Sequence, residues 1–248
     1  MLVLKMIAAL AVTSCVLLGQ AKSEEVLKVG ITTTGVPLTF VDTLSSKSTG
    51  AMVDLAASIA TECGMRVEYE VSAFPALIPA LTTGKINLIS AAMFVTQKRK
   101  EVVDFSLPVY EFGETMFVAA NDSNDYTREA LKGETVGAPI GSTIAEDLQQ
   151  TGLFTEVRQY DSIADIVRDV RLGRIKAGFA DRPIVAYQLS RKPDLGVRLV
   201  EGYKPLLVGQ VALAVSKHNA ALLERINAAI EKLQRRGDIA KIFAQYGL

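Results

Sequence analysis

The sequence predicts an α/β protein with two lobes and a ligand cleft at the hinge between them. Strand-like and helix-like segments alternate along the chain, which is typical of parallel βαβ units. One helix–turn–strand unit recurs with similar turn residues, and two glycine-containing segments are suited to connect the halves. The 248 residues fit one large domain or two small ones. We expect each lobe to be a mixed, mainly parallel sheet flanked by helices.

The N-terminal segment is typical of a secretory signal peptide. Lys5 supplies a positive charge, Met6–Leu18 is apolar, and small residues occupy the cleavage positions at 19–21. We predict that residues 1–21 are removed and that the mature protein lies in the periplasm. A lipid-anchored form is the alternative, because VTSC, ending in Cys15, resembles a lipobox. The residues after Cys15 stay apolar, which favours the cleaved form.

The charge balance and the scarcity of cysteine and histidine exclude several classes of protein. Lys+Arg and Asp+Glu are equal at 27 each, so no overall field attracts nucleic acid or an anionic membrane. Cys63 is the one cysteine of the mature chain, and we expect it to be a small buried apolar residue. His218 is the single histidine, so neither a zinc hydrolase nor a serine hydrolase is predicted. We expect no metal and no cofactor.

In the first half, apolar periodicity defines the elements. Residues 53–63 carry apolar side chains on one helical face, and residues 66–71 alternate between charged and apolar side chains. We predict helices over Met52–Cys63 and from Pro75 to about Thr83, and strands over Val26–Ile31, Arg66–Val71 and Ile86–Ser90.

The second half repeats one of these units. Gly84-Lys85-Ile86 follows the helix that begins near Pro75, and Gly173-Arg174-Ile175 follows a second amphipathic helix. Ser162, three residues before Asp165, is a capping signal for that second helix. Two explanations of the repeat are open: duplication of the architecture, or the general similarity of βα units.

Two crossings divide the chain into lobes. We predict lobe 1 over residues 24–108 and 212–248, lobe 2 over residues 114–206, and hinge crossings at 109–113 and 207–211. The return segment is predicted to hold a strand over Val211–Ser216, a helix that stops at Gly237, and a last helix. A crevice between two hinged lobes is the expected binding site.

Arg99 is the first candidate site residue. Thr96 is a good N-cap and places Arg99 at the third position of a helix, where free N–H groups and the helix dipole favour an anion. A guanidinium there adds a fork suited to a carboxylate. The alternative is that residues 98–101 form an ordinary solvated charged face.

The second half offers complementary groups. Asp181 lies at the carboxyl end of an apolar strand, where ligands meet open α/β sheets, and is suited to an ammonium group. Ser142 and Thr143 stand in a glycine-containing turn between a strand and a helix, which is suited to a carboxylate. Arg99, Asp181 and this turn together suit a zwitterion.

Across the whole mature chain the sequence resembles the periplasmic amino-acid-binding proteins of ABC importers, in the polar amino acid branch of solute-binding protein family 3. The segments that carry the resemblance are VG (29–30), VDLA (53–56), LIPAL (77–81), TxxR (96–99), VDFSxP (103–108) and GDIAKI (237–242). The resemblance implies the type II periplasmic-binding-protein fold. It also implies that Arg99 holds the ligand α-carboxylate, that Asp181 holds the α-ammonium, and that Ser142 and Thr143 add contacts to the carboxylate.

The chain departs from the family pattern at the side-chain subsite. The family often carries an acid and an aromatic residue after the first strand, where this chain has Thr32 and Gly35. The family often has Ser-Gly before a methionine and Thr or Ser after it, where this chain has Ala91, Ala92, Met93 and Phe94. We therefore expect a subsite less acidic and more apolar than in binders of basic amino acids. Phe74 and Phe94 are candidate walls, with core packing as the alternative for both.

These features predict a monomeric receptor that captures an L-amino acid or a derivative between its lobes and delivers it to an ABC permease. The alternative is an enzyme resembling cyclohexadienyl dehydratase, with Asp181, Glu111 or Glu114 as general acid. A sensor domain of a signalling receptor is not expected, since the last predicted helix ends next to Leu248.

Overall fold

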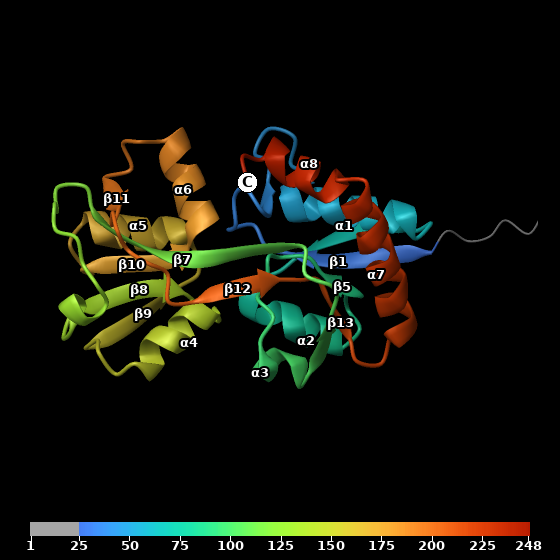
Figure 1. The fold of residues 1–248 in the computed structure, drawn as a ribbon, viewed down its shortest axis with the longest axis horizontal. Helices are drawn as coiled ribbons and strands as arrows, with labels where there is room; N and C mark the ends of the chain where they lie inside the picture. Colours follow the sequence, from blue (N-terminus) through green and yellow to red (C-terminus); the bar gives the residue numbers. More distant parts are fainter. Residues whose placement is uncertain (1–24) are drawn as a thin grey trace, which may run out of the picture.

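Two sheets, each covered by helices, form two lobes that lie side by side in the computed structural model (Figure 1). The structure describes residues 25–248; the predicted signal peptide and Cys15 lie outside them. Within the described part of the chain, no helix is both long and apolar enough to cross a membrane.

Lobe 1 contains a five-stranded sheet with the order β4-β1-β5-β13-β6. β1 pairs in parallel with β4 and β5, whereas β13 runs antiparallel to β5 and β6. The strands are β1 (Val26–Ile31), β4 (Arg66–Val71), β5 (Leu88–Ile89), β6 (Val103–Phe105) and β13 (Ala214–Ser216), and a hairpin of β2 (Phe40–Val41) and β3 (Ser48–Thr49) stands apart. The helices are α1 (Ala51–Glu62), η1 (Phe74–Ala76), α2 (Leu77–Thr82), α3 (Gln97–Lys100), α7 (Ala220–Arg235) and α8 (Asp238–Gln245).

Lobe 2 is built in the same way, with the strand order β11-β7-β10-β8-β9. β8 pairs in parallel with β9 and β10, and β7 runs antiparallel to β10 and β11. The strands are β7 (Tyr110–Ala119), β8 (Thr135–Pro139), β9 (Glu156–Tyr160), β10 (Ala177–Asp181) and β11 (Val197–Leu199). The helices are η2 (Glu129–Leu131), α4 (Thr143–Gln150), α5 (Ile163–Arg171) and α6 (Arg182–Arg191). The predicted type of fold, α/β with a mixed sheet in each lobe, is confirmed.

Local signals place most elements within a residue or two of their predicted positions. β1 and β4 have the predicted bounds, and Ser162 caps α5 by accepting a hydrogen bond from the Asp165 amide. Two predicted strands are wrong in extent. Only Leu88–Ile89 of the strand predicted over Ile86–Ser90 forms, and the strand predicted over Val211–Ser216 is divided between β12 (Val208–Val211) and β13.

The repeated turn has the same geometry in both lobes. Gly84 and Gly173 both have left-handed backbone conformations, with φ of 76° and 66°. The Lys85 amide donates to the Ala80 carbonyl and the Arg174 amide to the Asp169 carbonyl, each at 2.9 Å. A glycine in this conformation satisfies the last carbonyls of a helix and directs the chain into the next strand.

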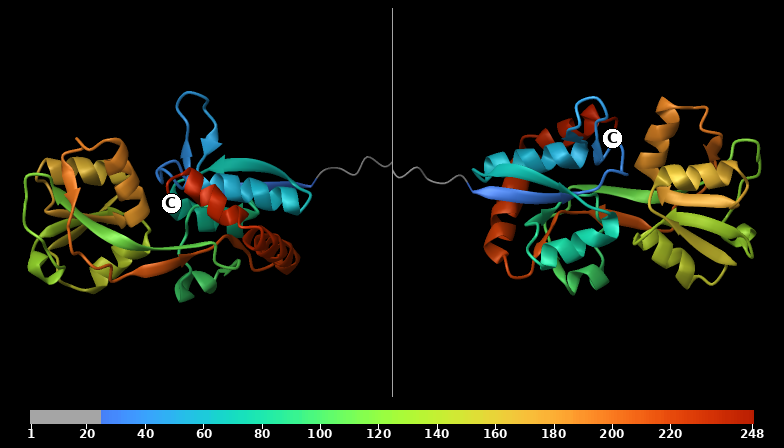
Figure 2. Two further views of the ribbon diagram at one scale, coloured as in Figure 1. Left: turned by 45° about the horizontal axis from the view of Figure 1, so that its top comes forward. Right: turned by 180° about the vertical axis from the view of Figure 1, so that it is seen from behind.

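The lobes are connected by an antiparallel ladder between β7 and β12, visible as the two long arrows that cross between them (Figure 1). Tyr110 pairs with Val211, and Gly113 pairs with Val208. Figure 2 shows from two further sides that this ribbon joins the lobes along one side of the molecule. The crossings predicted at 109–113 and 207–211 fall on this ladder, and their role as hinges stays a prediction.

Candidate functional site

A cavity of about 390 Å³ lies between the lobes. Lobe 1 contributes the loops that follow β1, β4 and β5, and lobe 2 contributes the loops that follow β8, β9 and β10. These are the carboxyl ends of the parallel strands, the usual position for ligands in open α/β sheets. Six of the predicted site residues line the cavity: Thr32, Gly35, Phe74, Ala91, Ser142 and Asp181.

Asp181 is the last residue of β10 and precedes α6 directly. An aspartate at a helix N-cap usually accepts a hydrogen bond from the helix, but the Asp181 side chain makes no such bond. Its half-buried carboxylate therefore remains available to the cavity that it lines. Burial raises the pKa of Asp181 to about 7, against a lowering by Arg99 and a further rise from Glu114.

Arg99 occupies the predicted position in α3, where the Thr96 hydroxyl accepts a hydrogen bond from its amide. Its guanidinium donates to the Phe94 carbonyl at 2.8 Å and, across the cleft, to the Gly141 carbonyl at 3.3 Å. The guanidinium carbon also lies 5.4 Å from the centre of the Phe74 ring. Burial lowers the pKa of Arg99, while Glu146 and Asp181 raise it. Arg99 and Asp181 belong to different lobes, and the charge of each affects the pKa of the other.

Arg99 and Met93 line a neighbouring cavity of about 250 Å³ rather than the main one. Phe74 and Pro75 line both cavities, so the Phe74 ring stands between the two spaces and beneath the guanidinium. An arginine has five N–H donors, and the two backbone carbonyls engage only part of them. Donors therefore remain for an anion beside Phe74.

The turn before α4 differs from expectation in its hydrogen bonds. The Ser142 hydroxyl donates to the Pro139 carbonyl at 2.6 Å and accepts from the Ala145 amide at 3.1 Å. Its single proton is thus engaged by the Pro139 carbonyl, while its oxygen caps α4. Thr143, at the first helical position, does not line either cavity. The backbone N–H groups of this turn are further candidate donors to an anion, and the contacts predicted for Ser142 and Thr143 stay a prediction.

Phe94 is not a wall of the cavity. It is 5% exposed, and its ring centre lies 4.8 Å from that of Phe112 on β7. A Cβ atom on Gly209 of β12 would lie 2.5 Å from the Phe94 ring, so the ring packs against the connecting ladder. The Phe94 side chain is thus part of the packed core, which was the alternative to a role as a cavity wall.

The side-chain end of the cavity is only partly as predicted. The Thr32 hydroxyl is buried and hydrogen-bonded to the Thr39 hydroxyl at 2.9 Å. A Cβ atom on Gly35 would lie 3.1 Å from the Thr39 hydroxyl and 3.8 Å from the Ile184 side chain of lobe 2, so little space is left there. Asp161, which the sequence did not single out, also lines this cavity, since only the fold brings the end of β9 to the cleft.

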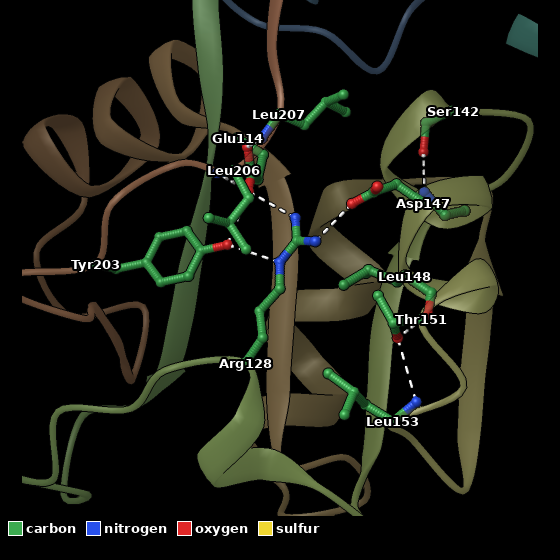
Figure 3. A network of polar contacts seen from close by, with 11 residues as sticks. Glu114, Arg128, Ser142, Asp147, Leu148, Thr151, Leu153, Tyr203, Leu206 and Leu207 are labelled. Atoms are coloured by element: carbon green, nitrogen blue, oxygen red, sulfur yellow. Dashed lines mark hydrogen bonds and ion pairs between the residues drawn. The ribbon is translucent and has the colours of Figure 1, made fainter.

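Neither Glu111 nor Glu114 lines either cavity. Glu114 is fully buried in lobe 2, where it forms an ion pair of 2.7 Å with Arg128 and accepts hydrogen bonds from Tyr203 and the amides of Leu206 and Leu207 (Figure 3). Arg128 also contacts Asp147 of α4. The network fastens the return crossing to β7, which is a structural role.

The described residues contain no group of three or more histidine, cysteine, aspartate or glutamate side chains placed to hold a metal ion. The two-lobed fold and the cavities between the lobes, lined by Asp181 and by Arg99, are those of a binding protein. The chain belongs to the bacterial extracellular solute-binding proteins, family 3, whose model matches residues 27–248. The resemblance found in the sequence is confirmed.

Relatives and solved structures agree with this assignment. The probable amino-acid-binding protein YxeM of Bacillus subtilis is 30% identical over 98% of this chain and 93% of its own. The ABC transporter arginine-binding protein 1 of Escherichia coli is 28% identical over 91% of this chain and 92% of its own. An ancestral arginine-binding protein bound to arginine has a TM-score of 0.82 at 32% identity, covering 90% of this chain and 98% of that one. The ancestral amino acid-binding protein AncCDT-1, a precursor of cyclohexadienyl dehydratase, has a TM-score of 0.80 at 27% identity, covering 89% of this chain and 95% of that one.

Proposed function

We propose that this protein captures an L-amino acid, or a close derivative, in the cavity between its lobes and delivers it to an ABC permease of the inner membrane. The observation that carries the proposal is the placement of a cation and a carboxylate from different lobes at adjoining cavities: Asp181 of lobe 2 lines the main cavity, and Arg99 of lobe 1 lines the neighbouring one beside Phe74. A zwitterion between them would place its carboxylate against the free donors of Arg99 and its ammonium against Asp181.

Binding of this kind couples to closure of the lobes. Each end of the ligand is held by a different lobe, so both contacts form only in the closed arrangement, and the ligand stabilises that arrangement by its greater affinity for it. The permease would then recognise the closed form. We infer that the protein acts as a monomer in the periplasm, and that residues 1–21 direct it there.

Thermal unfolding tests the proposal. Mature protein, unfolded to remove bound ligand and refolded, is heated with each of the twenty L-amino acids and with several opines. A ligand at a thousand times its dissociation constant adds about 4 kcal/mol to the free energy of unfolding, which raises the melting temperature by several degrees in a chain of this size. A shift confined to one chemical group of zwitterions supports the proposal, and no shift with any zwitterion contradicts it.

One observation favours a second candidate function. A carboxyl group whose pKa is raised to about 7 in a cleft is suited to general acid catalysis, and Asp181 is such a group. The enzyme would resemble cyclohexadienyl dehydratase, with Asp181 as its acid, since Glu111 and Glu114 stand away from the cavity. Incubation with prephenate and arogenate distinguishes the candidates: turnover that is lost in Asp181→Asn supports the enzyme, and inertness toward both compounds removes it.

A further inference from the structure

The charge on the cavity wall is entirely negative. Asp161 and Asp181 are the charged residues that line the cavity, and no lysine, arginine or histidine among the described residues does so. Arg99, the cation proposed for the ligand carboxylate, lines the neighbouring cavity. Under the proposed function one ammonium group of the ligand neutralises Asp181, which leaves the charge of Asp161 without a counterpart.

Asp161 is held in a fixed position by the backbone around it. It follows Tyr160 at the carboxyl end of β9, and the Tyr160 carbonyl accepts a hydrogen bond of 2.9 Å from the amide of Ile140. The next residue, Ser162, caps α5. The Asp161 side chain itself is exposed, and no residue of the described range 25–248 forms an ion pair with it. An ordered backbone thus presents an unpaired carboxylate at the rim of the cavity.

The remaining cavity wall is suited to an aliphatic chain. Val71, the last residue of β4, is 48% exposed, and Ile140, in the turn after β8, is 38% exposed. Both line the cavity together with Ile184. Apolar side chains that face an internal space favour methylene groups of a ligand. On the lobe 1 side the rim is formed by Thr33 and Thr34, whose exposed hydroxyls add hydrogen-bonding capacity but no charge.

We propose that Asp161 determines specificity by pairing with a cation at the end of the ligand side chain. The ligand class is then an L-amino acid whose methylene stem ends in an ammonium or guanidinium group. This inference rests on the proposed function. It also revises the expectation drawn from Thr32, because the acid that the loop after β1 lacks is supplied from lobe 2, at the end of β9.

Isothermal titration of ligand-stripped protein with L-arginine and L-citrulline tests the inference. Citrulline has the length of arginine but a neutral urea group in place of the guanidinium. The ratio of the two affinities therefore measures how much the charge at the end of the side chain contributes to binding. Wild-type protein should bind arginine about tenfold more tightly than citrulline or better, the effect of one hydrogen-bonded charge. Asp161→Asn should bring the ratio to about one by weakening arginine alone, and added salt should reduce the wild-type ratio.

Asp194→Asn is the matched control. Asp194 is an exposed acid of lobe 2 that does not line the cavity, so its substitution removes the same charge at a distance and should leave the ratio unchanged. Equal affinity of wild-type protein for the two ligands overturns the inference, as does an undiminished ratio in Asp161→Asn. Binding of an L-amino acid without a side-chain cation, but of neither arginine nor lysine, also overturns it while the proposed function stands. Binding of no amino acid at all contradicts the proposed function itself.

Discussion

The guanidinium of Arg99 donates a hydrogen bond of 3.3 Å to the carbonyl of Gly141, so the main candidate ligand group of lobe 1 contacts lobe 2 directly. A second contact stands beside it, since the Lys98 ammonium lies 2.7 Å from the Glu146 carboxylate. The lobes are thus in contact on one side of the cavity, next to the place where a ligand carboxylate is expected.

Substitution of Arg99 tests the carboxylate site. Arg99→Ala should weaken ligand binding by about 2–5 kcal/mol, because a half-buried charged partner is removed. Arg99→Lys should recover only part of the loss, since an ammonium is a point charge without the planar fork. Isothermal titration measures both. Arg66→Ala, at an exposed arginine paired with Glu68 on β4, is the control and should bind as wild type does. Unchanged affinity in Arg99→Ala would show that the carboxylate lies elsewhere.

Asp181 should make binding depend on pH. An ammonium group binds the ionised carboxylate, so affinity for amine ligands should fall as the pH drops below about 7, the pKa of Asp181 in the free protein. Asp181→Asn should weaken the binding of amine ligands and remove this pH dependence. It should leave the affinity for a ligand that lacks the ammonium unchanged. Titrations between pH 5 and pH 8 measure the effect. A pH profile identical in both proteins would contradict the assignment.

The same group should lower the stability of the ligand-free protein at neutral pH. The folded state holds the Asp181 proton more tightly than the unfolded state, whose pKa is near the ordinary 3.8. The free energy of unfolding should therefore decrease as the pH rises from about 4 to about 7. Asp181→Asn should remove this contribution. Urea unfolding at several pH values compares the two proteins, and a wild-type contribution that grows with pH over this window would be inconsistent with a raised pKa.

The pair of Lys98 and Glu146 should favour the closed arrangement modestly. Both side chains are well exposed, so the pair contributes about 0.2–1 kcal/mol, and salt screens it. Lys98→Ala should weaken ligand binding by up to about fivefold at low salt and hardly at all at high salt. Lys100→Ala, at a neighbouring exposed lysine, is the control. A large loss that persists at high salt would show that Lys98 contacts the ligand instead.

The buried network around Glu114 should stabilise lobe 2 without contributing to ligand contacts. Glu114→Gln leaves Arg128 buried with a weaker partner, and the expected loss is about 3–5 kcal/mol in the free energy of unfolding. Glu111→Gln, on the same strand but exposed, is the matched control and should change the stability little. Urea unfolding measures the free energy of unfolding of both variants. Equal stability of both variants would mean that the network contributes nothing net.

Local features of the fold and the site could be predicted from the sequence because they depend on neighbouring residues. Thr96 caps the turn that holds Arg99, Ser162 caps α5, and Asp181 ends an apolar strand. Each pattern spans only a few positions, and the resemblance to a known family fixed how the pieces combine.

Features that depend on distant pairings were missed. Residues 110–113 and 208–211 form one ladder, yet nothing in either segment alone shows that they pair. Phe94 was a candidate wall because of its position beside Met93, but the ladder buries its ring. Asp161 reaches the cavity only because β9 ends at the cleft. Sequence periodicity predicts which face of an element is apolar, not which distant element will cover it.

A crystal structure of the protein with an amino acid selected from the thermal screen, bound at equimolar concentration, tests the central claim most directly. We predict the ligand in the cavity between the lobes, with its α-carboxylate on Arg99, its α-ammonium on Asp181, and the contact between Arg99 and Gly141 retained or replaced by ligand. A ligand held outside this cavity, or one whose carboxylate and ammonium touch neither residue, would contradict the claim.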